Sequence, residues 1–216
     1  MRNAYFDQLD TIVDDLVAMT HDVQVAVSRS THALLTADAQ VAEQVISDDA
    51  ALDAARERVE RKSFELLALQ QPVASDLRML VAGLRMVADL ERMGDLSVHV
   101  AKVARLRVPE VAVPAELSPT IERMAIVAEK MVGTVAVIIA ERDVEGARRL
   151  EEDDEEMDQL RRRSFTELLS DDWTHGVEAA VDVALLGRYY ERIADHAVSV
   201  ATRVVFVVTG QQPQRA

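Results

Sequence analysis

The sequence predicts an all-α protein built from long helices, because residues that break helices are scarce. Glycine and proline number only 7 and 5 among 216 residues, so the chain has few turns and its elements must be long. Between these few breaks, apolar residues recur with the period of an amphipathic helix. The second half of the chain also repeats motifs of the first half, which indicates a duplicated unit. Together these observations predict six helices, three in each half.

In the first half, the helices are separated by one capped turn and one proline. Residues 36–39, with the sequence TADA, form the first expected turn, and Asp38 is placed to cap the helix that follows. Pro72 ends that helix, and Ser75 or Asp76 stands near the start of the third. The three helices are therefore expected at about residues 5–35, 39–70 and 75–107.

A proline-containing linker divides the chain near its middle. Pro109, Pro114 and Pro119 follow one another at five-residue intervals within residues 108–119, and such closely spaced prolines do not fit inside one helix. We therefore expect two repeats as domains, residues 1–108 and 109–216. In the second repeat, the first helix is expected at about residues 118–140. The next helix should run from the turn at 141–146 to about residue 169, and the last from the turn at 170–176 to about residue 208.

The two halves align residue by residue, which indicates an internal duplication of a three-helix unit. With an offset of 105 residues, Asp38, Ala42, Val45, Asp48, Asp49 and Asp53 match Asp143, Ala147, Leu150, Asp153, Asp154 and Asp158. With an offset of 100, Glu91, Arg92, Asp95, Val98, Val100 and Ala101 match Glu191, Arg192, Asp195, Val198, Val200 and Ala201. The second half is thus five residues shorter, and we expect the deletion around its helix-to-helix turn and one helical turn nearby.

An acidic pair interrupts an otherwise apolar stripe on the third helix of each half. Glu91 and Asp95 in DLERMGD, like Glu191 and Asp195 in YYERIAD, lie four residues apart and share one helix face. Like charges at this spacing destabilise an isolated helix by roughly 0.2–0.5 kcal/mol. A locally unfavourable pair that occurs twice, at equivalent positions, indicates a functional role.

A second acidic pair, on the preceding helix, is expected to lie level with the first. The turn at Pro72 and the turn at residues 170–176 each join two antiparallel helices, so residues equidistant from the turn lie side by side. Each hairpin then assembles four carboxylates, which we call the first and second acidic quartets. They are Asp49, Asp53, Glu91 and Asp95 in the first half, and Asp154, Asp158, Glu191 and Asp195 in the second.

Four carboxylates at one level require counter-charge, so each quartet is a candidate cation site. Donor sets of carboxylates suit hard cations such as Mg²⁺, Mn²⁺, Ca²⁺ or Fe³⁺, one or more per site, and the absence of cysteine argues against structural zinc. Two other interpretations stay open. The acids could lie on solvated helix faces, or form salt bridges with arginines such as Arg92 and Arg192. His99 and His196 flank the motifs, and a structural role is the simpler expectation for both.

Charge and composition exclude several classes of function. The net charge of −14 repels nucleic acid and anionic lipid, and the lack of cysteine excludes disulfides and thiolate chemistry. The N-terminal sequence has no apolar segment typical of a signal peptide, and the most apolar run is about half a bilayer span. We therefore expect a cytoplasmic protein without direct membrane insertion. No P-loop, His-Glu-x-x-His, Glu-x-x-His or Gly-x-Ser-x-Gly motif indicates an enzyme.

Three motifs on the duplicated frame resemble the PhoU family of phosphate-transport regulators. They are QQPVASDLR at residues 70–78, DLERMGD at 89–95 and YYERIADHA at 189–197. The resemblance covers nearly the whole chain and implies two pseudo-symmetric three-helix bundles that lie side by side. It also implies metal ions, often in multinuclear clusters, at both acidic quartets. The glycine that the family has before the last aspartate is present as Gly94 but replaced by Ala194, so the second site departs from the family's pattern at this position.

The resemblance further implies a regulatory function without catalysis. Members of the family act as negative regulators of the phosphate-starvation response, and they link the ATPase subunit of a phosphate ABC transporter to a sensor histidine kinase. The resemblance thus predicts a metal-binding adaptor at the inner face of the membrane, and we expect a homodimer. The alanine, valine and arginine content of the chain is typical of an actinobacterial member of the family. The alternatives are a carboxylate-cluster metalloenzyme of the phosphoesterase kind and a metal-free helical scaffold.

Overall fold

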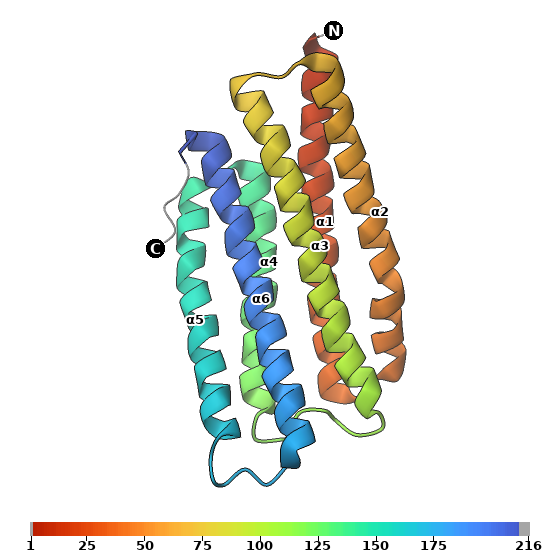
Figure 1. Ribbon diagram of the computed structural model, residues 1–216, viewed down its shortest axis with the longest axis vertical. Helices are drawn as coiled ribbons and strands as arrows, with labels where there is room; N and C mark the ends of the chain where they lie inside the picture. Colours follow the sequence, from red (N-terminus) through yellow and green to blue (C-terminus); the bar gives the residue numbers. More distant parts are fainter. Residues whose placement is uncertain (1, 212–216) are drawn as a thin grey trace.

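The structure, a computed structural model that describes residues 2–211, consists of six α-helices in two three-helix bundles that lie side by side (Figure 1). The helices are α1 (Arg2–Thr36), α2 (Ala39–Gln70), α3 (Ala74–Arg107), α4 (Ser118–Glu141), α5 (Val144–Leu168) and α6 (Gly176–Thr209). No strand occurs in this range. The predicted all-α class and all six helices are confirmed, and each helix end lies within a few residues of its expected position.

Equivalent aspartates start the second helix of each bundle. The side chain of Asp38 accepts hydrogen bonds from the backbone N–H groups of Gln40 and Val41, as predicted for a capping residue. Asp143 accepts one from the N–H group of Gly146 at the start of α5. Such caps satisfy backbone donors that have no partner inside the helix, so they fix where α2 and α5 begin.

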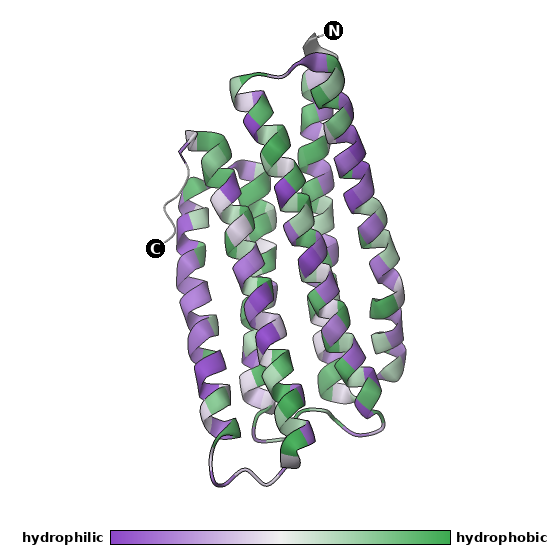
Figure 2. Ribbon diagram, viewed as in Figure 1, coloured by the Kyte–Doolittle hydropathy of each residue, from purple (hydrophilic) through white to green (hydrophobic). Residues whose placement is uncertain are grey.

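Four inner helices join the two bundles, whereas α2 and α5 contact only helices of their own bundle. α1 packs against α4, and α3 packs against α6 in the antiparallel direction. Figure 1 shows α2 and α5 at opposite edges of the molecule, and Figure 2 shows hydrophilic residues along much of both. Among the described residues, no helix has a long enough apolar stretch to cross a lipid bilayer.

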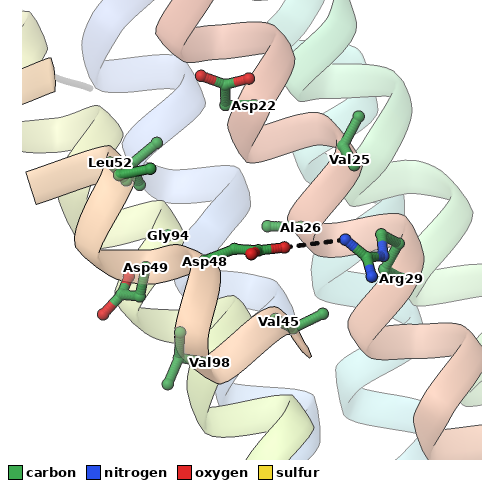
Figure 3. Close-up of a pocket in the computed structure, with 11 residues that line it drawn as sticks. Asp22, Val25, Ala26, Arg29, Val45, Asp48, Asp49, Leu52, Gly94 and Val98 are labelled. Carbon is green, nitrogen blue, oxygen red and sulfur yellow. Dashed lines mark hydrogen bonds and ion pairs between the residues drawn. The ribbon is translucent and has the colours of Figure 1, made fainter. Parts of the chain in front are cut away.

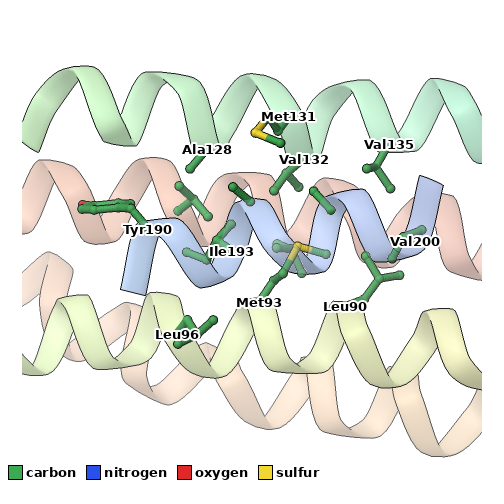
Figure 4. Close-up of a cluster of buried hydrophobic side chains, with 14 of the residues drawn as sticks. Leu90, Met93, Leu96, Ala128, Met131, Val132, Val135, Tyr190, Ile193 and Val200 are labelled. Atoms are coloured by element: carbon green, nitrogen blue, oxygen red, sulfur yellow. The ribbon is translucent and has the colours of Figure 1, made fainter. Parts of the chain in front are cut away.

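The hydrophobic core is continuous across both bundles. Buried side chains from α3, α4 and α6 meet between the helices, among them Leu90, Met131 and Ile193 (Figure 4). α1 takes part as well, because the hydroxyl of the fully buried Tyr190 on α6 lies 2.8 Å from the hydroxyl of Thr31. The division of the chain into domains at residue 108 stays a prediction.

Charged side chains also connect α3 to α6. Arg107 forms ion pairs with Glu178 and with the buried Asp182, whose Oδ2 accepts a hydrogen bond of 2.6 Å from Arg107 Nε. Towards the other end of α6, Asp89 pairs with His196 at 2.9 Å and with Arg203 at 3.1 Å. His196 therefore serves the contact between the bundles, which agrees with the structural role expected for it.

Candidate functional site

The first acidic quartet lies along the boundary where the outer helix α2 packs against the inner helix α3, which we call the first groove. The two helices run antiparallel (Figure 1), as the turn at Pro72 predicts. Burial raises the pKa of Asp49, and the charges of Asp95 and Asp53 raise it further. Burial also raises the pKa of Glu91, with a further contribution from Asp95. These carboxylates are therefore close enough to repel one another.

The second groove lies between α5 and α6 and assembles the second acidic quartet in the same way. Burial raises the pKa of Asp154 to about 6, and Asp195, Asp158 and Glu191 add to the effect. Burial and the charge of Glu191 raise the pKa of Asp195 as well. The hairpin geometry predicted from the sequence thus brings four acids to one groove in each half of the molecule.

Arginines compensate only part of this negative charge. Asp95 pairs with Arg92 at 2.8 Å, and Asp158 lies 3.4 Å from Arg162. The interpretation in which arginines neutralise all the acids predicts a basic partner at each of the four pairs. The pair formed by Asp49 and Asp53 forms no ion pair with any side chain that the structure describes, although Lys102 and His99 partly offset the rise in the pKa of Asp49. Asp154 and Asp195 likewise form no ion pair with any described side chain.

The two glutamates of the quartets accept hydrogen bonds from arginines that the sequence analysis did not single out. Arg56 donates to Glu91 at 3.1 Å, and Arg161 donates to Glu191 at 2.9 Å. Glu191 also forms an ion pair with Arg188. Arg56 and Arg161 are related by the same offset of 105 residues as the acids of α2 and α5, but so are Arg58 and Arg163, so the repeat alone does not show which arginines contact the glutamates.

A close approach of α2 to α3 explains the glycine in the first motif. A Cβ atom added at Gly94 would lie 2.1 Å from Leu52 Cδ2 and 3.8 Å from Asp49 Oδ1. Gly94 therefore lets Leu52, which lies between the two acids of α2, pack directly against α3. In the second groove the equivalent position is Ala194, which is fully buried, and the position of Leu52 is taken by the flexible side chain of Met157.

The aspartates that precede Asp49 and Asp154 hold the outer helices to the first helix of each bundle. Figure 3 shows Asp48 and Asp49 pointing in opposite directions. Asp48 pairs with Arg29 of α1 at 3.0 Å, and both line a cleft of about 250 Å³. Asp49 lines the same cleft and also lies near Asp95 of α3, whose charge raises its pKa. In the second bundle, Asp153 pairs with Lys130 of α4 at 2.6 Å. In each Asp-Asp dipeptide, the first carboxylate therefore forms an ion pair with the first helix of its bundle, and the second belongs to an acidic quartet.

The donor chemistry of both quartets fits a hard cation. All eight residues offer carboxylate oxygens, and the pKa values of Asp49, Glu91, Asp154 and Asp195 are raised first by burial and then by the charges of neighbouring carboxylates. Over residues 2–211, no three carboxylate or imidazole groups converge closely enough to ligate one ion, and both glutamates are turned to arginines. The assignment of the eight acids as metal ligands therefore stays a prediction.

Comparison with known proteins identifies the family. The model of the PhoU domain matches the chain twice, at residues 16–104 and 121–204. The chain is 47% identical to the phosphate-specific transport system accessory protein PhoU homolog 2 of Mycobacterium tuberculosis, over 99% of this chain and 100% of that protein. It is 45% identical to the PhoU homolog 1 of Mycobacterium leprae, over 99% of this chain and 96% of that protein.

Solved structures share the same fold. The phosphate transport system regulatory protein PhoU of Streptococcus pneumoniae superposes with a TM-score of 0.87 at 24% identity, covering 98% of this chain and 100% of that one. PhoU of Pseudomonas aeruginosa superposes with a TM-score of 0.85 at 26% identity, covering 96% and 100%. These likenesses confirm the two pseudo-symmetric three-helix bundles. Since the family model covers most of the sequence and the mycobacterial relatives align along its whole length, the chain belongs to the PhoU family.

Proposed function

We propose that this chain is a metal-binding regulatory adaptor of phosphate transport, without catalytic activity of its own. The observation that carries the proposal is the acidic quartet, which recurs at equivalent grooves in both repeats of a PhoU-family chain. The names of its relatives, accessory proteins of a phosphate-specific transport system, support an association with such a system. They also support a regulator rather than an enzyme.

In this proposal each quartet holds one or more hard cations, of Mg, Mn, Fe or Ca. The ligands would be Asp49, Asp53, Glu91 and Asp95 in the first groove, and Asp154, Asp158, Glu191 and Asp195 in the second. A bound cation would supply the positive charge that the carboxylates lack, and would replace their mutual repulsion with attraction to a shared ion. The outer helices α2 and α5 would then be fastened to α3 and α6.

The proposed partners are the ATPase subunit of a phosphate ABC transporter and the sensor histidine kinase of the phosphate two-component system. The chain would act as a homodimer in the cytoplasm, at the inner face of the membrane, and keep the starvation response off when phosphate is plentiful. The net charge of −14 favours docking to basic protein surfaces and disfavours nucleic acid.

Metal binding is tested by comparing the purified full chain with a Glu91→Ala/Asp95→Ala variant. Elemental analysis and thermal unfolding after exposure to Mn²⁺ or Fe³⁺ are the measurements. The wild type is expected to retain metal and to gain stability from it, because a ligand that binds only the folded state shifts unfolding to higher temperature. The variant is expected to retain less. Equal metal content and equal unfolding temperatures in the two proteins would rule out the clamp.

The regulatory role is tested in a cell that lacks its own gene for this chain and carries a reporter of phosphate starvation. The wild-type chain is expected to keep the reporter off in phosphate-replete medium, whereas the chain with all four acids of the first quartet changed to amides is not. The control changes four exposed acids without ion pairs: Asp14→Asn, Glu57→Gln, Glu65→Gln and Glu122→Gln. If the control fails as the quartet variant does, general loss of charge explains the result instead.

The partners are tested directly with purified proteins. The full chain is expected to retain the ATPase subunit and the cytoplasmic part of the kinase in a pull-down, more weakly at high salt because the contact is electrostatic. Cross-linking in the same preparation reports the expected homodimer. Retention of neither partner, with or without Mn²⁺, would contradict the adaptor.

A further inference from the structure

A matched arginine stands beside each quartet, one helical turn beyond the acids of the outer helix. Arg56 follows Asp53 by three residues on α2, and Arg161 follows Asp158 by three residues on α5. Both point across their groove. Arg56 Nη1 lies 3.1 Å from Glu91 Oε1, and Arg161 Nη1 lies 2.9 Å from the Oε1 atom of Glu191. The duplicated frame thus repeats an ion pair as well as an acidic quartet.

The two glutamates depend on this positive charge. Only 13% of the Glu91 side chain and 11% of the Glu191 side chain are exposed. A carboxylate that is largely removed from water needs a partner, because burying an uncompensated charge is unfavourable. A guanidinium group and a hard cation both meet this need, and they seek the same oxygen atoms.

The arginines themselves are held by few contacts. Each side chain remains 34% exposed, and the Nε atom of each is buried without a hydrogen-bond partner among the described residues. Each arginine also has a second neighbour four residues along its helix. Glu60 Oε1 lies 3.9 Å from Arg56 Nε, and the ring of Phe165 lies 5.3 Å from the guanidinium carbon of Arg161. When a guanidinium group leaves its glutamate, it can therefore still contact this second neighbour, Glu60 for Arg56 and Phe165 for Arg161.

From this geometry we propose that Arg56 and Arg161 are internal counter-cations that compete with the metal ion for Glu91 and Glu191. The proposal rests on the metal-binding function proposed above and adds its regulation. Without metal, the arginines hold the glutamates and keep each groove intact. A metal ion that enters displaces them, so the strength of each ion pair lowers the metal affinity of its own groove.

The two grooves are expected to differ in affinity. Glu191 carries a second arginine, Arg188, on its other carboxylate oxygen. In the first groove the other oxygen of Glu91 faces Arg92 at 3.7 Å, which is beyond hydrogen-bonding distance. Each glutamate therefore has two arginine neighbours, but only Glu191 is hydrogen-bonded to both, so more hydrogen bonds must be broken to free Glu191 than to free Glu91. The first groove should fill at a lower metal concentration than the second.

The test is calorimetric titration of the metal-free full chain with Mn²⁺, one groove at a time. Asp154→Asn/Asp158→Asn leaves only the first groove, and Asp49→Asn/Asp53→Asn leaves only the second. In these backgrounds, Arg56→Gln and Arg161→Gln are each expected to tighten Mn²⁺ binding about tenfold, the range of one partly buried charge-assisted hydrogen bond. The matched controls, Arg58→Gln on α2 and Arg163→Gln on α5, remove the same charge outside the grooves. They should change the affinity by less than about twofold.

Thermal unfolding gives a second readout that separates competition from a structural role. Without metal, Arg56→Gln should unfold at a lower temperature than the wild type, because Glu91 loses its partner. With saturating Mn²⁺ the deficit should vanish. Arg56→Lys, which keeps the charge, should bind Mn²⁺ with an affinity between those of the wild type and Arg56→Gln.

Two results would overturn the proposal. Weaker Mn²⁺ binding in Arg56→Gln and Arg161→Gln would mean that the arginines help to position the ligands, and unchanged binding would mean that they do not compete. In both cases the wild type still binds metal, so the proposed function survives. If the wild type and all variants bind no Mn²⁺, both the inference and the proposed metal site fail.

Discussion

Individual residues decide how closely each outer helix approaches its inner neighbour. Gly94 is the clearest example, because the space that a methyl group would occupy is already filled by Leu52. The sequence showed the glycine within the acidic motif but could not show what lies opposite it. Only the packed helices show that its role is steric. At the equivalent positions of the second bundle, alanine replaces Gly94 and methionine replaces Leu52, and both are buried.

The steric role of Gly94 predicts that the effect of Gly94→Ala on the free energy of unfolding changes sign when Leu52 is replaced by alanine. In the wild-type background, Gly94→Ala should lower the free energy of unfolding by about 1 kcal/mol, since overpacking against Leu52 outweighs the gain in helix propensity. In the Leu52→Ala background the methyl group has room, and the same change should raise the free energy of unfolding by about 1 kcal/mol. Urea denaturation of the four proteins provides the measurement. Equal effects in both backgrounds would contradict the contact.

Asp154 predicts how the stability of the metal-free protein depends on pH. The folded protein holds this proton up to a pKa of about 6, whereas the unfolded chain releases it near 3.8. Between these values the folded state binds more protons, so raising the pH from about 4 to about 6 should destabilise the protein. Urea midpoints across this range provide the measurement.

The Asp154→Asn variant should lose much of this pH dependence, and the exposed Asp14→Asn control should keep it. With saturating Mn²⁺ the protein should instead become more stable as the pH rises, because the metal binds the deprotonated carboxylates. If the metal-free wild type became more stable between pH about 4 and about 6, groups other than Asp154 would determine how its stability depends on pH.

At the scale of the helix, the ends were predictable because the signals that set them are local. Asp38 and Pro72 act on backbone groups a few residues away, so their effects can be inferred from sequence alone. The hairpin turn also fixed which acids face each other across α2 and α3. The arginine partners of Glu91 and Glu191 were missed, because choosing among several arginines requires the rotation of each helix about its own axis. Sequence spacing alone does not supply that rotation.

The caps at the start of α2 and α5 should each contribute measurably to stability. Asp38→Ala and Asp143→Ala each remove a side chain that accepts backbone hydrogen bonds, and each should lower the free energy of unfolding by about 1 kcal/mol. Asp14→Ala, an exposed aspartate in the middle of α1, should change it by less than about 0.5 kcal/mol. Chemical denaturation provides the comparison. A cap variant as stable as the Asp14 variant would contradict the assignment.

At the scale of the whole molecule, the continuous core predicts that both bundles unfold together. Trp173, the only tryptophan, lies between α5 and α6, so its fluorescence reports on the second bundle, whereas far-ultraviolet circular dichroism reports on all six helices. The two signals should give the same denaturation midpoint, because α1 with α4 and α3 with α6 share one core. Separate midpoints would show that the repeats are independent units.

The shared core has a consequence for how such a chain could arise. Within either bundle, the first and third helices turn apolar faces towards the other bundle, while the second helix contacts only its own. A chain of one repeat would leave those faces bare, so it would have to pair with an identical copy about a two-fold axis. Fusion of two such genes would keep the pairing within one polypeptide and free each copy to diverge. The two halves already differ at equivalent positions, with glycine at 94 and alanine at 194.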